Sequence, residues 1–229
     1  MLLALFFPLA LMGLAYYLWQ SVAVSASVSI TPDMTPVIVV DAGHGGFDGG
    51  AVVGNVVEKD INLAISLRLR DLMQVCGYRV SMTREADVST AQQPSGKARS
   101  QKVEDMHNRL QQLESFPNAL FLSIHQNKFQ QSRYSGAQVF YSPNHPDSET
   151  LATYIQNQFK ALLQPENTRE IKKAGSELFL LYNAKTPAVL VECGFLSNPQ
   201  EREKLITPEY QSQVALTVLS ATAQYLAQQ

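Results

Sequence analysis

The stretch Val37–Asn55, VIVVDAGHGGFDGGAVVGN, decides the fold of this chain. It begins with β-branched apolar residues that end at an aspartate, VIVVD, which is typical of a parallel strand covered on both faces. The glycine-rich residues that follow predict an irregular loop. From Glu58 to Val75 apolar residues recur at helical spacing, and Gly77 ends the pattern. The sequence therefore predicts a strand, a glycine-rich loop and a helix in succession.

Two later stretches repeat the pattern of a buried strand. They are ALFLSIH at Ala119–His125 and AVLVEC at Ala188–Cys193, and each is apolar until a polar residue near its end. Weaker strand patterns occur at Tyr78–Thr83, Ala137–Ser142 and Glu177–Leu181. Periodicity or capping residues predict helices at Lys102–Ser115 and Asp147–Leu163, after Asn198-Pro199, and from Pro208 to about Ala227. This alternation predicts an α/β fold, a three-layer α/β/α sandwich on a largely parallel sheet.

Composition excludes several classes of function. The 229 residues include 18 basic and 20 acidic ones, so no overall cationic field exists to hold nucleic acid. Two cysteines, Cys76 and Cys193, are too few for a disulfide framework or a zinc knuckle.

The amino terminus differs in composition from the rest of the chain. Leu2–Trp19 contains no charged residue and approaches the roughly 20 residues that cross a bilayer. Its aromatic residues gather at one end, as in an interfacial belt, and the small residues at 21–29 suit a signal peptidase. We expect residues 1–32 to be a signal or membrane-anchor segment with a linker, and residues 33–229 to form one folded domain. Export is favoured over a buried core helix, while cleavage and anchoring both remain open.

Four polar residues are expected at one edge of the sheet. His44 follows the first strand, His125 ends the strand from Ala119, and Glu192 lies near the end of the strand from Ala188. Glu58 opens the first helix, whose amino terminus returns to the same edge in a βα unit. Ligands of open α/β sheets bind outside the carboxyl ends of the strands, so these side chains should converge there.

This set of side chains suits a catalytic zinc ion. Two imidazoles and one carboxylate bind Zn²⁺ and leave a fourth position for water, whose pKa the metal lowers toward about 7. A separate carboxylate can then move the proton to a leaving amine. The pattern predicts hydrolysis of an amide.

Other polar residues near the predicted site have different expected roles. Arg84, just past the second strand, and Asn127, after His125, are candidate substrate-binding residues. His107 and His145 are expected to be solvated. A Cys193–His125 pair would instead make a thiol hydrolase. Successive strand residues point to opposite faces, so Cys193 should face a helix layer if Glu192 faces the site.

Three motifs carry a resemblance to a known family. VDAGHGGFDGGAVVGNVVEKDINL, FLSIHQN and PAVLVECGFLSNPQE, in this order, resemble the zinc-dependent N-acetylmuramoyl-L-alanine amidases of the type-3 catalytic family. The similarity runs from about Val37 to Ala227. It implies one Zn²⁺ ion held by His44, Glu58 and His125, and Glu192 as the catalytic glutamate. The second motif reads SIHQN where division amidases usually have SIHAN, which places Gln126 beside a ligand.

The resemblance also implies a substrate and a biological setting. The substrate would be the amide between N-acetylmuramic acid and L-alanine of peptidoglycan. Within the family the chain is most similar to the germination amidases of endospore-forming bacteria, which implies a role in forming cortex muramic δ-lactam with a partner deacetylase. The expected location is the outer face of the cytoplasmic membrane or the cell wall, including the forespore intermembrane space. Alternatives are a wall-turnover or division amidase, a zinc peptidase of similar fold, and a non-catalytic wall-binding module.

Overall fold

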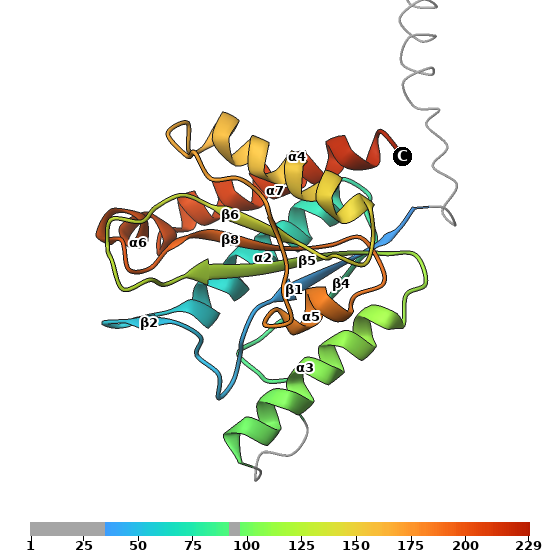
Figure 1. Ribbon diagram of the computed structural model, residues 1–229, viewed down its shortest axis with the longest axis horizontal. Coiled ribbons are helices and arrows are strands. Elements are labelled where there is room, and N and C mark those ends of the chain that lie inside the picture. The colour runs from blue at the N-terminus through green and yellow to red at the C-terminus, as the bar shows by residue number, and fades with distance from the viewer. Residues whose placement is uncertain (1–34, 92–96) are drawn as a thin grey trace, which may run out of the picture. The chain divides into compact units, whose positions relative to one another are not determined.

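The computed structural model describes residues 35–91 and 97–229 (Figure 1). Pro36–Gln229 form a compact unit of their own. The predicted signal or anchor segment lies outside the described residues. Within the described ranges, no helix is both long and apolar enough to span a membrane.

The centre of the domain is a six-stranded sheet with the strand order β4-β1-β5-β8-β6-β7. The strands are β1 (Val37–Ala42), β4 (Val80–Met82), β5 (Ala119–Asn127), β6 (Gln138–Tyr141), β7 (Lys172–Lys173) and β8 (Ala188–Phe195). β4, β1, β5 and β8 run parallel to one another, whereas β6 is antiparallel to β8 and β7 follows β6. The carboxyl ends of β1, β5 and β8 therefore meet at one edge, as the sequence predicted.

Helices cover both faces of this sheet (Figure 1). One face carries α2 (Glu58–Val75), α4 (Asp147–Leu162) and α7 (Pro208–Leu226), and the other carries α3 (Ala98–Glu114) and α5 (Phe179–Asn183). Successive residues of a strand point to opposite faces, so each central strand contributes side chains to the apolar clusters on both sides of the sheet. In β1, for example, Ile38 and Val40 pack on the first face and Val39 packs on the second. The predicted three-layer α/β/α sandwich is confirmed.

Two helix starts follow the predicted capping chemistry. The Asn198 side chain accepts hydrogen bonds from the backbone N–H groups of Gln200 and Glu201 at the start of α6 (Pro199–Leu205). The Thr207 hydroxyl accepts one from the N–H group of Tyr210 at the start of α7. In both, proline occupies the first helical position, where its missing N–H costs nothing.

Three local predictions were wrong. The stretch Glu177–Leu181 is no strand, because its apolar residues enter the short helix α5 and pack on the same face of the sheet as α3. The glycine-rich loop is not wholly irregular, since β2 (Val52–Val53) and β3 (Val56–Val57) form an antiparallel hairpin in it. The helix predicted from Lys102 begins at Ala98, because polar residues of its first turn carry no apolar periodicity to mark it.

Candidate metal centre

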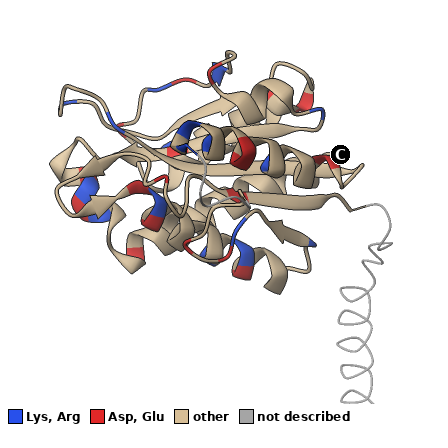
Figure 2. Cartoon of the chain, turned by 90° about the horizontal axis from the view of Figure 1, so that it is seen from below, with Lys and Arg blue, Asp and Glu red and all other residues tan. Residues whose placement is uncertain are grey.

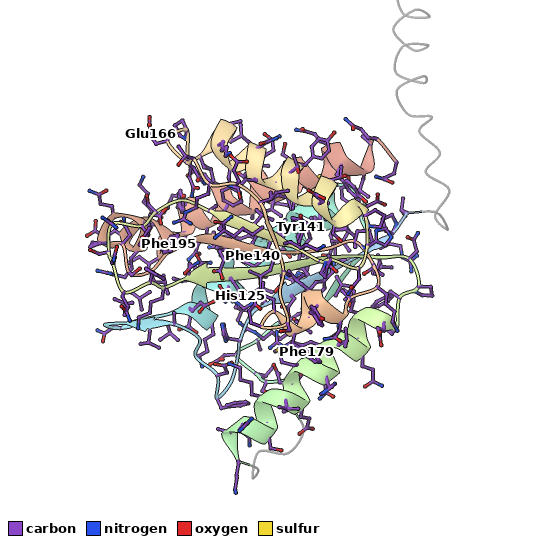
Figure 3. All side chains as sticks on the ribbon, viewed as in Figure 1. His125, Phe140, Tyr141, Glu166, Phe179 and Phe195 are labelled. Atoms are coloured by element: carbon purple, nitrogen blue, oxygen red, sulfur yellow. The ribbon has the colours of Figure 1, made fainter. Side chains whose placement is uncertain are left out.

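Side chains from three elements converge at the carboxyl edge of the sheet. His44 follows β1, Glu58 is the first residue of α2, and His125 extends from β5 (Figure 3). One ligand atom from each lies within 4.8 Å of the others. Glu58 Oε1 lies 3.0 Å from His125 Nδ1 and 3.3 Å from His44 Nε2. Two imidazole nitrogens and one carboxylate oxygen thus face a common point, which fits the donor set and spacing of a zinc site.

Glu58 is buried and its carboxylate is fixed by hydrogen bonds. Its Oε2 accepts from the backbone N–H of Ala51 at 2.7 Å, and its Oε1 accepts from that of Gln126 at 3.1 Å. Asn62, one turn further along α2, donates to Glu58 Oε1 and to the Gly43 carbonyl. Burial on its own raises the pKa of Glu58, but the hydrogen bonds with the two histidines outweigh it and the pKa falls far below its ordinary value. Glu58 is therefore an oriented carboxylate whose environment favours the ionised form, as a metal ligand requires.

His44 is oriented by a carboxylate behind it. Its Nδ1 lies 3.0 Å from Asp48 Oδ2, which also accepts from Lys102 Nζ at 2.9 Å. Burial on its own lowers the pKa of His44, but hydrogen bonds with Asp48 and Glu58 raise it to about 9. A carboxylate on the far nitrogen fixes the tautomer of a ligand histidine and increases its basicity. Because Asp48 meets Nδ1 of His44, the other ring nitrogen, Nε2, faces Glu58 and the point on which the three side chains converge.

Two glycines allow the loop to approach these ligands. A Cβ atom on Gly43 would overlap the imidazole ring of His125. Gly50 has a φ of +68°, and a Cβ atom there would lie 2.6 Å from Glu58 Oε2. Glycine at these two positions therefore lets the loop backbone pass close to the His125, Glu58 and His44 side chains.

Glu192 lies beside the metal point without being one of the clustered ligands. It is paired with His125 across β5 and β8, so both side chains point to the α3 face of the sheet. Its Oε2 is buried and has no hydrogen-bond partner among the described residues. Burial raises the pKa of Glu192 to about 7. An unpartnered carboxylate with a pKa near neutrality is suited to exchange a proton with a bound ligand.

A cavity of about 280 Å³ opens beside this cluster on the α3 and α5 side. It is bounded by His44, His125 and Asp48 at one end, and its walls are mainly apolar. The wall side chains include Met106, Phe121, Phe179 and Leu190. A substrate thus has space next to the convergent ligands.

Arg84 was predicted to be a substrate-binding cation, but in the structure its side chain is buried and bound to backbone carbonyls. The side chain is 3% exposed, and its guanidinium donates to the backbone carbonyls of Ala42, Gly43, Lys59 and Ala86. Four of its five N–H groups are thereby used inside the protein. Arg84 holds the loop that carries His44. Its place after β4 was inferred correctly, but three of its four carbonyl partners lie 25 to 42 positions away, and periodicity does not reveal such contacts.

Asn127, the other predicted substrate residue, is half-buried at the end of β5. Its backbone carbonyl accepts from the N–H of Leu196 at 2.7 Å. A register shift separates it from His125. These contacts do not test the role of Asn127 in substrate binding, which stays a prediction.

Arg109 is a structural residue of the site that the sequence analysis missed. It is fully buried in α3 and donates to the carboxylates of Asp41 at 2.6 Å and Asp105 at 2.8 Å. It also donates to the carbonyls of Ala42 at 2.9 Å and His44 at 2.7 Å. Among the described residues, His44 is the only non-glycine residue with positive φ, at 63°. The hydrogen bond from Arg109 helps to hold this strained conformation.

Removing Arg109 should strongly destabilise the domain. Arg109→Met leaves the buried Asp41 carboxylate without its cation, and such a loss costs about 3–5 kcal/mol of unfolding free energy. The measurement is urea unfolding followed by circular dichroism. The matched control is Lys185→Met, which breaks an exposed pair with Glu114 and should cost at most about 1 kcal/mol. Equal, small losses in both variants would contradict the role given to Arg109.

Cys193 is fully buried on the opposite face of the sheet from Glu192. It belongs to the apolar cluster against α2, α4 and α7. Burial raises the pKa of its thiol well above the ordinary value. Strand alternation predicted this orientation, and the structure confirms it. A thiol hydrolase built on Cys193 and His125 is excluded, because the two side chains lie on different faces.

Comparisons with known proteins decide the family. Residues 38–224, which include every residue of the cluster, match the family described as N-acetylmuramoyl-L-alanine amidase. The chain belongs to the N-acetylmuramoyl-L-alanine amidase family. Enzymes of this family hydrolyse the amide between N-acetylmuramic acid and L-alanine of peptidoglycan, and the resemblance seen in the three sequence motifs is confirmed.

Individual relatives agree with this assignment. The chain is 38% identical to the germination-specific N-acetylmuramoyl-L-alanine amidase of Bacillus subtilis, over 82% of this chain and 79% of that protein. It is also similar to the CwlD amidase from Clostridioides difficile, solved in complex with the GerS lipoprotein. That structure has a TM-score of 0.82 and 38% identity, covering 85% of this chain and 100% of the other. The amidase Ami1 from Mycobacterium smegmatis, at 21% identity and a TM-score of 0.70, shares the fold.

Proposed function

We propose that this amidase uses a single Zn²⁺ ion held by His44, Glu58 and His125. The observation that carries the proposal is the convergence of three donor atoms of suitable chemistry within 4.8 Å. Bound there, the ion would polarise the carbonyl of the scissile amide and lower the pKa of a water molecule. The remaining chemistry belongs to side chains of the chain itself.

Glu192 is proposed as the general base and acid. It lies opposite His125 in the sheet, and its Oε2 is unpartnered among the described residues, so it is available to accept a proton from the attacking water. The same carboxyl group can pass that proton to the amine of L-alanine as the C–N bond breaks. The adjacent cavity, whose walls are mainly apolar, would hold the substrate beside these groups.

The residues behind the ligands keep their geometry during this reaction. Asp48 holds the ring of His44, and Asn62 together with backbone N–H groups holds Glu58. Arg84 and Arg109 hold the carbonyls of the loop between β1 and the hairpin. Catalytic groups must be held within a fraction of an ångström, and this network supplies that restraint.

The direct test of the proposed function is analysis of reaction products. Purified peptidoglycan is incubated with the protein, with added zinc or with a chelator, and the fragments are identified by mass spectrometry. Free stem peptides that begin with L-alanine, released only with zinc, are expected. Cleavage within the stem peptide would support the zinc peptidase alternative, and binding without release of peptides would support a wall-binding module.

Replacing Cys193 should leave hydrolysis nearly unchanged. Cys193→Ser removes the thiol while changing the volume of the buried site little, and the thiol touches no group of the metal cluster. Turnover within about twofold of wild type is expected, because the loss of one buried thiol affects packing and stability rather than chemistry. Stem-peptide release is measured alongside the unfolding midpoint. Complete inactivation of a folded variant would revive the thiol hydrolase hypothesis.

The biological setting we propose is the spore cortex. The support is the similarity to a germination-specific amidase over most of both chains. The location that we propose is the cell wall or the forespore intermembrane space. The predicted deacetylase partner and the predicted membrane contact of residues 1–32 stay predictions. Because the C. difficile relative was solved with a lipoprotein, a lipoprotein is a further partner candidate for this chain. Deleting the gene should give spores without muramic δ-lactam, whereas chained vegetative cells would indicate a division amidase.

A further inference from the structure

A second cavity, of about 650 Å³, lies outside the metal cluster. It opens where the β5–β6 loop, the α4–β7 loop and α6 meet. The metal cluster and the mechanism above use none of its residues.

This cavity lies at the same edge of the sheet as the metal cluster. β5 and β8 end at this edge, and β6 begins at it because β6 runs antiparallel to β8. β7 begins there too, because it runs parallel to β6. Along β8, Phe195 is three residues beyond Glu192, which corresponds to about 10 Å of extended chain. Strand alternation points Phe195 to the α4 and α7 face, whereas Glu192 points to the α3 face, so a ligand of a few residues that starts at the metal cluster would reach this cavity by passing over the end of the sheet.

The cavity contains cations that are already positioned. Arg169 lies over the ring of Phe195, with its guanidinium carbon 4.5 Å from the ring centre, and 5.9 Å from the ring centre of Tyr134. It donates to the Ser135 carbonyl at 2.8 Å and to Gln138 Oε1 at 3.2 Å. Its remaining nitrogen, Nη2, has no partner among the described residues. A guanidinium held in this way loses little conformational entropy when it binds an anion.

Two further cations line the same space. The guanidinium carbon of Arg133 lies 5.4 Å from the ring centre of Tyr134, and Lys204 belongs to α6. Neither side chain has a hydrogen-bond partner in the part of the chain that the structure describes. The Glu201 carboxylate accepts hydrogen bonds from the backbone N–H groups of Gly136 at 2.8 Å and Phe195 at 2.7 Å, and the charges of Arg169 and Lys204 act on it as well. Glu166 also lines the cavity, so three cations face two carboxylates there. We name Arg133, Tyr134, Arg169, Phe195 and Lys204 the arginine–aromatic pocket.

We propose that the arginine–aromatic pocket binds a free carboxylate of the peptidoglycan stem peptide, beyond the L-alanine of the scissile amide. This inference rests on the proposed function and specifies how the same enzyme recognises its substrate. Charges elsewhere on the domain are mixed, with acidic and basic residues interspersed over the same elements (Figure 2), so a local cluster of available cations is selective. The glycan is neutral near the cut, whereas stem peptides carry carboxylates beyond their first residue. Guanidinium groups bind carboxylates in a bidentate geometry.

The experiment measures binding of a defined peptide without hydrolysis. The probe is L-alanyl-γ-D-glutamyl-diaminopimelate, titrated calorimetrically into the zinc-loaded full chain, and its counterpart has every carboxylate amidated. Arg133→Gln combined with Lys204→Gln should weaken binding of the free peptide about tenfold or more, because charge-assisted hydrogen bonds are lost. The amidated peptide should bind weakly to both proteins. Circular dichroism and zinc content confirm that the variant is folded and loaded.

The matched control removes two cations from the opposite edge of the domain. Arg79 precedes β4 and Lys185 precedes β8, so Arg79→Gln combined with Lys185→Gln makes the same change in charge away from the pocket. It should leave peptide binding unchanged. Equal weakening by both double variants, unchanged binding in the pocket variant, or equal affinity for the amidated peptide would each overturn the proposal. Binding that persists in a protein without amidase activity would overturn the proposed function and leave this site standing.

Discussion

Glu192→Gln is expected to retain zinc and the fold while turnover falls by 10²- to 10⁴-fold, the usual contribution of a general acid–base group. Glutamine has nearly the shape of glutamate but cannot accept the proton of the attacking water. The buried Oε2 of Glu192 makes no hydrogen bond within the described residues, so an amide in its place breaks no existing contact. The loss should therefore appear in kcat and leave the folded structure intact.

The measurement is stem-peptide release at saturating substrate, with zinc content determined by plasma emission spectrometry on the same samples. Glu114→Gln is the matched control, because Glu114 is a partly exposed glutamate at the end of α3 that pairs with Lys185 on the surface. It should retain wild-type turnover. A loss below about tenfold for Glu192→Gln would refute the role of Glu192 as general base.

His125→Ala is expected to release the metal and abolish hydrolysis. Removing one of three protein ligands leaves His44 and Glu58 to hold the ion. Substituting a residue that hydrogen-bonds to a metal ligand typically lowers metal affinity 10- to 100-fold. Removing the ligand itself should therefore lower metal affinity by more than about 100-fold. Burial of Glu58 without its His125 partner should also lower stability, since a buried carboxylate then loses a hydrogen bond.

Metal affinity is measured by competition with a chromogenic chelator. His145→Ala serves as the control, because His145 lies in the loop before α4, at the opposite edge of the sheet. It should bind zinc as tightly as wild type. Full metal content in folded His125→Ala would rule out His125 as a ligand.

The architecture was predictable because buried strands have continuous runs of apolar residues in the sequence. VIVVD, ALFLSIH and AVLVEC are mostly apolar on both faces, a pattern typical of parallel strands covered by helices on both sides. The polar residue near the end of each run then marks the site, because all three runs end at one edge. His44, His125 and Glu192 could be placed together for this reason, and strand alternation correctly separated Cys193 from them.

The supporting residues could not be found in this way. Arg109 reads as one more charge on a polar helix, and only the packing of α3 on the sheet brings it to Asp41, 68 positions earlier. Arg84 was placed at the correct edge, but whether a cation faces solvent or a carbonyl depends on the path of a loop. Asp48, four residues after His44, offered a local signal, since a carboxylate close to a ligand histidine often orients its ring.

The hold of the two buried arginines on the carbonyls of residues 42–44 has a consequence for how the enzyme acquires its metal. Guanidinium groups keep their charge at every physiological pH, so this restraint is present in the protein before an ion arrives. The ordering of the His44 loop is then completed during folding, and its entropy is not lost again when the ion binds. The proposed Zn²⁺ ion would then bind to side chains that the two arginines already hold in place, and its binding would require no folding of the His44 loop.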